Sequence, residues 1–187
     1  DLKGQLHRGS KVSVAAACFS IYAYEALRKE LSDIDEFRFI FTSPTFIKEY
    51  TTKQQKEFYI PRLQRERALY GSEFELRLRN QMSQRAIAKE CAEWIRTKAK
   101  FKSNVSGGVV NGFLTCEKDE DKFVYMPFNE FTTTELGLER GNNLCPTSLR
   151  LSFPMSDKYI RDFNELWKDE RQFADVTEHV IDNISNV

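Results

Sequence analysis

The order of apolar segments at the start of the chain constrains the fold more than any other feature of this sequence. KVSVAAACFS, residues 11–20, is a short run rich in Val and Ala, which is typical of a buried strand. In the next stretch, residues 21–34, apolar residues recur at helical spacing, and residues 37–41 predict a second strand. A strand, a helix and a strand in this order predict two parallel strands joined by a right-handed crossover.

A long charged segment follows these two strands. Residues 52–99 predict a mainly helical insert. The last helix of this insert, AIAKECAEWIRTKAK, has an apolar stripe formed by Ile87, Cys91, Trp94 and Ile95. Its last turn is basic, which suits the C-terminal end of a helix.

The rest of the chain predicts more strands and two final helices. Strands are expected at residues 109–117 and 122–127, and LRLSF, residues 149–153, predicts a further short strand. The segment from residue 157 to residue 184 predicts two helices. We therefore expect an α/β fold in which a mixed sheet is flanked by helices.

The composition indicates how many domains the chain forms and argues against one class of function. Of the 187 residues, 41% are apolar and 30% are charged, so we expect one domain spanning residues 1–187. The formal net charge is zero, which argues against a generally basic nucleic-acid binder and allows only a local basic patch. Because the chain begins with Asp1, we expect it to be a fragment of a longer protein.

The cysteines and histidines form no metal-binding motif. The four cysteines include no CxxC pair, and the two histidines lie at opposite ends of the chain, so we expect neither a metal nor a cofactor. Cys18 and Cys91 fall within apolar patterns and predict buried free thiols in a reducing compartment, which indicates a cytoplasmic location. No apolar run reaches transmembrane length, so we expect no membrane partner.

The strongest basic cluster is RTKAKFKSN, residues 96–104. Its cations occupy alternate positions, at Arg96, Lys98, Lys100 and Lys102. If the segment is extended, these side chains share one face and Phe101 points to the other. This arrangement predicts a strip that contacts the phosphates of a nucleic acid. The alternative interpretation is a basic helix end that continues into a solvated strand, and the neutral net charge favours this alternative.

The sequence contains no recognisable catalytic motif. It has no P-loop and no GxGxxG, and neither histidine lies in a motif. The SGG segment at residues 106–108 could present backbone N–H groups to an anion, although a Gly pair before a strand is usually a turn. The acidic run at residues 117–121 lacks the spacing of a calcium-binding loop and predicts a solvated hairpin turn.

Three stretches together resemble the phospholipase-D-like superfamily. They are GSKVSVAAACFSIYAYEALRKEL, FRFIFTSPTFIKE and VNGFLTCEKDEDKFVYMPFNEFTTTELGLERGNN. The chain looks most like the phospholipase-D-like domain at the N-terminus of bacterial helicases of superfamily II. The resemblance implies a phospholipase-D-like fold over nearly the whole chain, followed by helicase domains in the same protein.

Active members of this superfamily use an HxKxxxxD motif, followed by a polar N-x-T-like segment. The His is the nucleophile on phosphorus, and the Lys binds the phosphate. In this chain Asn111 stands at the His position, Phe113 at the Lys position, and Asp119 near the Asp. Asn cannot act as the nucleophile and Phe cannot bind phosphate, so no catalytic residue is expected.

The polar residues that remain in the motif region are Asn111, Asn129 and Thr132. One interpretation is that they hydrogen-bond a nucleic acid in a residual cleft. The other is that they satisfy backbone groups at strand ends and turns.

The resemblance implies a non-catalytic accessory domain that helps an ATP-dependent bacterial helicase to engage DNA or a partner protein. Two alternatives stay open: a phosphodiesterase or nuclease with a rearranged site, and an oligomerisation domain. Active superfamily members assemble two motifs at one site, so the resemblance also implies a homodimer as one arrangement of this chain.

Overall fold

The computed structural model describes residues 2–43, 47–50, 56–59, 81–138 and 148–186, and it contains a seven-stranded sheet in the order β8-β7-β6-β1-β2-β5-β9. The strands of this sheet are β1 (Lys11–Ala16), β2 (Glu36–Phe41), β5 (Ala99–Asn104), β6 (Phe113–Lys118), β7 (Asp121–Met126), β8 (Leu149–Ser152) and β9 (Phe173–Asp175). The helical elements are η1 (Leu2–Gln5), α1 (Ile21–Ala26), α2 (Arg28–Asp33), α5 (Gln81–Lys98), α6 (Met155–Lys168) and α7 (Thr177–Ser185). The predicted α/β fold with a mixed, helix-flanked sheet is therefore confirmed at this level.

The predicted parallel pair lies at the centre of the sheet. β1 runs parallel to β2, and β2 runs parallel to β5. The connection from β1 to β2 is helical, as expected, but it is divided into α1 and α2, which meet at Leu27. Ser20 caps α1, because its Oγ accepts hydrogen bonds from the backbone N–H groups of Tyr22 and Ala23.

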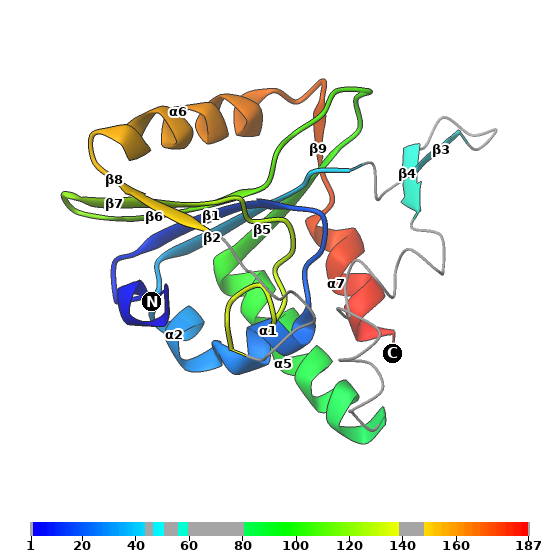
Figure 1. Cartoon of the computed structure of the whole chain (residues 1–187). Coiled ribbons are helices and arrows are strands. Elements are labelled where there is room, and N and C mark those ends of the chain that lie inside the picture. Colours follow the sequence, from blue (N-terminus) through cyan, green and yellow to red (C-terminus); the bar gives the residue numbers. More distant parts are fainter. Residues whose placement is uncertain (1, 44–46, 51–55, 60–80, 139–147, 187) are drawn as a thin grey trace.

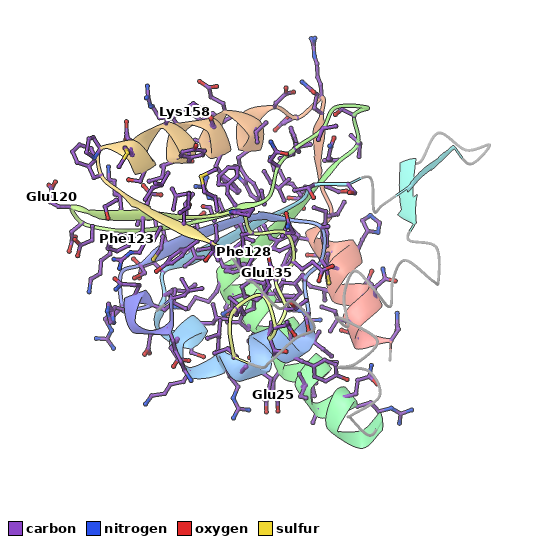
Figure 2. All side chains as sticks on the ribbon, in the orientation of Figure 1. Glu25, Glu120, Phe123, Phe128, Glu135 and Lys158 are labelled. Carbon is purple, nitrogen blue, oxygen red and sulfur yellow. The ribbon has the colours of Figure 1, made fainter. Side chains whose placement is uncertain are left out.

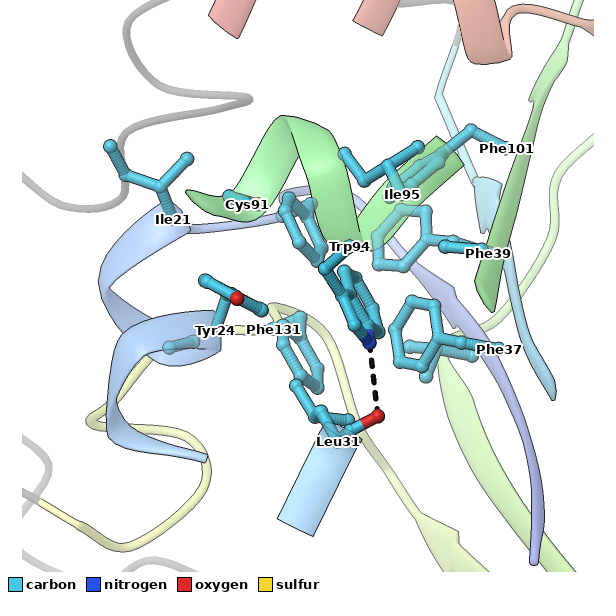
Figure 3. Close-up of a cluster of buried hydrophobic side chains, with 14 of the residues drawn as sticks. Ile21, Tyr24, Leu31, Phe37, Phe39, Cys91, Trp94, Ile95, Phe101 and Phe131 are labelled. Carbon is cyan, nitrogen blue, oxygen red and sulfur yellow. Dashed lines mark hydrogen bonds between the residues drawn. The ribbon is translucent and has the colours of Figure 1, made fainter. Parts of the chain in front are cut away.

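One face of the sheet, here called the aromatic face, is packed with rings. α1, α2, α5 and α7 lie on this side (Figure 1). Phe37, Phe39 and Phe101 are fully buried there. The ring of Trp94, from α5, lies 5.1 Å from the ring of Phe37, and its Nε1 donates a hydrogen bond to the carbonyl oxygen of Leu31 at 3.0 Å (Figure 3). The apolar stripe predicted for α5 therefore faces the sheet.

The opposite face, here called the α6 face, is crossed by α6 (Figure 1). Its buried apolar cluster is smaller and consists of Ala15, Ile40, Phe113, Val124, Ile160, Phe163 and Phe173. Side chains alternate between the two faces along each strand. In β2, Phe37 and Phe39 therefore pack on the aromatic face, and Arg38 between them reaches the α6 face.

The prediction of a mainly helical segment at residues 52–99 is wrong for part of its length. Lys56–Tyr59 form β4, which pairs antiparallel with β3 (Ile47–Tyr50), and Ile47 lies opposite Tyr59. The segment KEFY ends in two aromatic residues, and residues of this type favour strands. The helical prediction holds for α5, while residues 51–55 and 60–80 lie outside the described residues.

The remaining strands agree with the sequence pattern, with two differences. The predicted hairpin is β6 and β7, but β6 begins at Phe113, later than residue 109. Asp119 lies in its turn with a φ of 51°. β9 was not predicted, because three residues are too few to show an alternating pattern, and it exists through pairing of Phe173 with Asn104.

Cys18, Cys91 and Cys116 are buried and form no disulfide, as predicted for Cys18 and Cys91, while Cys145 lies outside the described residues. Burial raises the pKa of the Cys116 thiol to about 11. Among the helices that the structure describes, none is long and apolar enough to span a membrane.

Candidate anion-binding surface

The predicted binding residues are divided between two opposite edges of the sheet. β1, β2 and β5 are parallel, so their first residues share one edge and their last residues share the other. Each of these strands has six residues, which places the two edges about 20 Å apart. The basic cluster lies at the edge where the strands begin, here called the basic edge, whereas Asn111 and Asn129 lie near the other.

Residues labelled in the side-chain view illustrate this separation. Glu120, in the turn between β6 and β7, lies far from Phe128 and Glu135 (Figure 2). Phe128 and Glu135 belong to the segment that follows the end of β7. The turn between β6 and β7 lies at the basic edge, because Lys11 at the start of β1 pairs with Glu117. The basic cluster and the polar residues of the motif region lie at opposite edges and form no common surface.

The basic edge contains a hollow of about 360 Å³, here called the basic hollow. Its lining consists of Lys11, Asp35, Glu36, Arg96, Thr97, Lys98, Ala99 and Lys100. The sequence brings these cations together because α5 ends at Lys98 and β5 begins at Ala99, with no loop between them. The basic last turn of the helix and the first lysine of the strand consequently face the same space.

The cations of the basic hollow differ in how far they are neutralised. Arg96 donates a hydrogen bond from Nη1 to Oε1 of Glu93 at 2.6 Å. Lys98 donates from Nζ to the carbonyl oxygen of Ile34 at 2.7 Å. Across the described parts of the chain, no carboxylate lies within ion-pair distance of Lys11 or Lys100, although Asp35 and Glu36 share the hollow. These two ammonium groups are therefore the most available for an anion.

Lys102 is directed away from the basic hollow. Its Nζ donates a hydrogen bond to the carbonyl oxygen of Trp167 at 2.6 Å and lies 4.8 Å from the centre of the Trp167 ring. Lys100 and Lys102 alternate with the buried Phe101, as predicted, but Arg96 and Lys98 are helical. The four cations therefore do not form one continuous extended strip.

At the other edge, the SGG segment is fixed by Asn104. The Nδ2 of Asn104 donates to the carbonyl oxygens of Thr42 and Gly108, at 2.9 and 3.0 Å. Its Oδ1 accepts from the N–H and the hydroxyl of Ser106, at 2.9 and 2.7 Å. The N–H of Gly108 is bonded to the Ser106 hydroxyl, so this segment is a turn held by its own side chains.

Of the three polar residues predicted from the motif region, Asn111 and Asn129 are exposed and Thr132 is only 2% exposed. The Oγ1 of Thr132 accepts a hydrogen bond from the N–H of Glu135 at 3.2 Å. The backbone of Asn129 bonds to Ala17 and to the side chain of Glu135. The buried Thr132 therefore stabilises a turn and has almost no surface with which to contact a nucleic acid.

The three positions that the resemblance placed against the HxKxxxxD motif, Asn111, Phe113 and Asp119, do not form one cluster in the structure. Phe113, at the Lys position, is 7% exposed and packs near the rings of Tyr159 and Phe163. Asn111 precedes β6 and Asp119 follows it, so these residues lie at opposite ends of the strand. No cluster of three or more His, Cys, Asp or Glu side chains that could hold a metal is present among the residues the structure describes.

Arg38 is a residue that the sequence reasoning missed. Its Nε and Nη2 donate to Oγ of Ser13 at 3.2 and 3.0 Å, and Nη2 also donates to Oδ1 of Asn164 at 2.9 Å. The guanidinium carbon lies 5.0 Å from the ring centre of Phe163 and 5.6 Å from that of Trp167. The signal was an Arg between Phe residues in the strand EFRFIF, where an apolar residue is expected.

No protein-family model matches the sequence, and no curated protein matches it.

Proposed function

We propose that this chain is a non-catalytic, phospholipase-D-like accessory domain that binds the phosphate backbone of DNA through the basic hollow. The observation that carries this proposal is the convergence of Arg96, Lys98 and Lys100 with Lys11 around one hollow. Lys11 is far from the other three in sequence, so the fold adds a cation to the predicted cluster. Phosphate contacts from Lys and Arg supply most of the affinity of a domain that does not read sequence.

The non-catalytic part of the proposal rests on Asn111 and Phe113. An amide cannot act as the nucleophile on phosphorus, and a buried phenyl ring cannot bind a phosphate. An accessory role in a DNA helicase follows from the resemblance of the three sequence stretches described above. The neutral net charge suits a domain that adds a modest, salt-dependent affinity for DNA to that of a larger helicase.

Salt-dependent DNA binding tests the proposal directly. Fluorescence anisotropy of a labelled duplex and a labelled single strand would be measured at about 50 and 200 mM salt. About three phosphate contacts predict a roughly 40-fold loss of affinity over this range. Replacing Lys11 and Lys100 together by Gln should lower the slope of log K against log salt by about 2.

Lys158→Gln is the matched control for this experiment. Lys158 lies on α6 (Figure 2), and its Nζ is paired with Asp162 at 2.7 Å. Its replacement should leave DNA binding unchanged, because Lys158 is outside the basic hollow. Absence of binding by the wild-type protein at micromolar concentration would overturn the proposal.

A second candidate function, oligomerisation, is favoured by one observation. β8 is the last strand of the described sheet; Leu149 within it is 65% exposed, and Phe153 and Met155, which follow it, are 62% and 64% exposed. An edge strand with exposed apolar neighbours can pair with a second copy. Light scattering over a range of concentrations tests this function: a dimer that Leu149→Lys disrupts supports it, and a monomer at all concentrations removes it.

A further inference from the structure

The basic hollow continues onto the α6 face through one row of paired residues. Ser13, Arg38 and Lys100 lie side by side on β1, β2 and β5, because Ser13 pairs with Arg38 and Arg38 pairs with Lys100. Neighbouring strands are about 4.8 Å apart, so these side chains are within reach of one ligand group. Lys100 also lines the basic hollow and therefore belongs to both regions.

The guanidinium of Arg38 is held in one orientation. Hydrogen bonds to Ser13 and Asn164 fix one side of the group, and the rings of Phe163 and Trp167 lie against it. These contacts involve Nε and Nη2, while Nη1 has no hydrogen-bond partner in the portion of the chain that is described. A planar guanidinium that is already ordered loses little conformational entropy when it binds a further group.

The positive charge of Arg38 lacks a directly bonded anion. Burial lowers the pKa of Arg38, and the carboxylates whose charge acts in the opposite direction are Glu36 and Glu117. Neither carboxylate, nor any other within the described residues, lies within ion-pair distance of Arg38. Removing a cation from water without an anionic partner is costly, and a bound anion would offset that cost.

Two further cations lie next to Arg38. Lys100 is exposed. Lys102 lies two residues further along β5 on the same face, and both Lys102 and Arg38 contact the ring of Trp167. Neither lysine forms an ion pair with a carboxylate of the described chain. Three like charges on adjacent strands repel one another. The attraction of each cation to a phosphate placed between them would offset this repulsion.

We propose that Arg38 and Lys100 together bind one phosphate group of the nucleic-acid backbone. The site extends DNA contact from the basic hollow onto the α6 face, so this inference rests on the proposed function. Arg38 supplies the fixed N–H donors and Lys100 supplies a mobile charge. Contacts of this type position the nucleic acid and read no base sequence.

A set of Gln and Lys variants tests whether Arg38 and Lys100 act on the same phosphate. Arg38→Gln and Lys100→Gln should each weaken duplex binding about tenfold and lower the salt slope by about 1. If both residues contact one phosphate, the double variant should lose much less than the product of the two single effects. Arg38→Lys, which keeps the charge, should retain most of the salt slope.

Arg150→Gln is the matched control for the arginine. Arg150 lies on β8, at the opposite end of the strand order from β5 and β9, and its guanidinium carbon lies 4.0 Å from the ring centre of Phe123. Like Arg38, it stacks on an aromatic ring, but Arg150 is exposed and remote from the proposed site. Its removal should leave both the affinity and the salt slope unchanged.

A second probe separates the site from the proposed function. Inorganic tripolyphosphate should raise the melting temperature of the wild type, and it should raise that of Arg38→Gln less, because the variant keeps only the cations of the basic hollow. If duplex DNA binds and Lys11→Gln weakens it, but Arg38→Gln behaves like Arg150→Gln, the inference about Arg38 is wrong and the proposed function stands. If tripolyphosphate stabilises the wild type more than Arg38→Gln and DNA does not bind, the anion site stands and the DNA function falls.

Folding of the variants is checked by circular dichroism and by the melting temperature. If Arg38→Gln does not fold, Lys100→Gln and Arg38→Lys carry the test, because neither leaves Ser13 and Asn164 facing an uncharged amide. In that case, equal salt slopes for wild type and Lys100→Gln would overturn the inference.

Discussion

The two faces of the central sheet show how one strand can serve a core and a surface at once. In β2, Phe37 is fully buried among rings on the aromatic face, and the next residue, Arg38, is a half-buried cation on the α6 face. α1, α2, α5 and α7 cover the aromatic face, whereas α6 crosses the other face (Figure 1). The difference indicates that stability is concentrated on the aromatic face and that the α6 face has room for charged groups with another role.

The largest expected effect comes from a cavity on the aromatic face. Phe37→Ala removes a ring that lies 5.6 Å from Phe131 and 5.1 Å from Trp94, and it should cost about 3–5 kcal/mol of the free energy of unfolding. Urea unfolding followed by tryptophan fluorescence measures this loss. A cost below about 1 kcal/mol would mean that the rings do not pack as described.

A smaller loss of the free energy of unfolding is expected from a substitution just before β6. A Cβ on Gly112 would lie 2.0 Å from the carbonyl oxygen of Phe128, which is backbone and cannot move aside easily. Gly112→Ala should therefore destabilise the protein by about 2–3 kcal/mol, as measured by the same urea unfolding. In Gly107→Ala the added Cβ has nothing within 4 Å, and this control should unfold as the wild type does, within about 1 kcal/mol.

The buried thiol of Cys116 makes the stability of the aromatic face depend on pH. Its pKa is raised by burial from 9.0 to about 11, so the folded protein keeps the proton after the unfolded chain has lost it. The free energy of unfolding should then fall as the pH rises from about 9 to about 11, by at most about 1.4 kcal/mol per pH unit for this group. Urea unfolding of wild type and Cys116→Ala at pH values on either side of 9 isolates this contribution.

The smallest effect on stability is expected on the α6 face. Arg38→Met removes a half-buried cation but leaves the Ser13 hydroxyl without that partner, and these two changes oppose each other. The free energy of unfolding should change by less than about 1.5 kcal/mol, far less than for Phe37→Ala. A loss as large as that of Phe37→Ala would assign Arg38 a structural role and remove the contrast between the faces.

The sequence predicted the elements whose residues form long or regular patterns. The parallel pair of β1 and β2, the hairpin of β6 and β7, and the apolar stripe of α5 follow from local periodicity. The same reasoning failed at Lys56–Tyr59, where a charged stretch contains a short strand that exists through pairing with β3. The hydrophobic periodicity of a segment does not by itself predict which other segment it pairs with.

The candidate site was predicted only in part, for the same reason. Arg96, Lys98 and Lys100 could be grouped because they are close in the sequence, and they do line one hollow. Lys11 and Arg38 join this region through the pairing of β1, β2 and β5, which no local pattern contains. Lys102, Asn111, Asn129 and Thr132 lie outside the hollow, because strand direction and burial place them elsewhere.

The direct junction between α5 and β5 restricts how the length of the chain can vary at this point. With no loop between Lys98 and Ala99, an inserted or deleted residue would shift β5 by one position in its pairing with β2. Such a shift exchanges the two faces of a strand, so Lys100 and Lys102 would enter the aromatic core and Phe101 would face α6. Substitutions at this junction should therefore be tolerated far better than changes in its length.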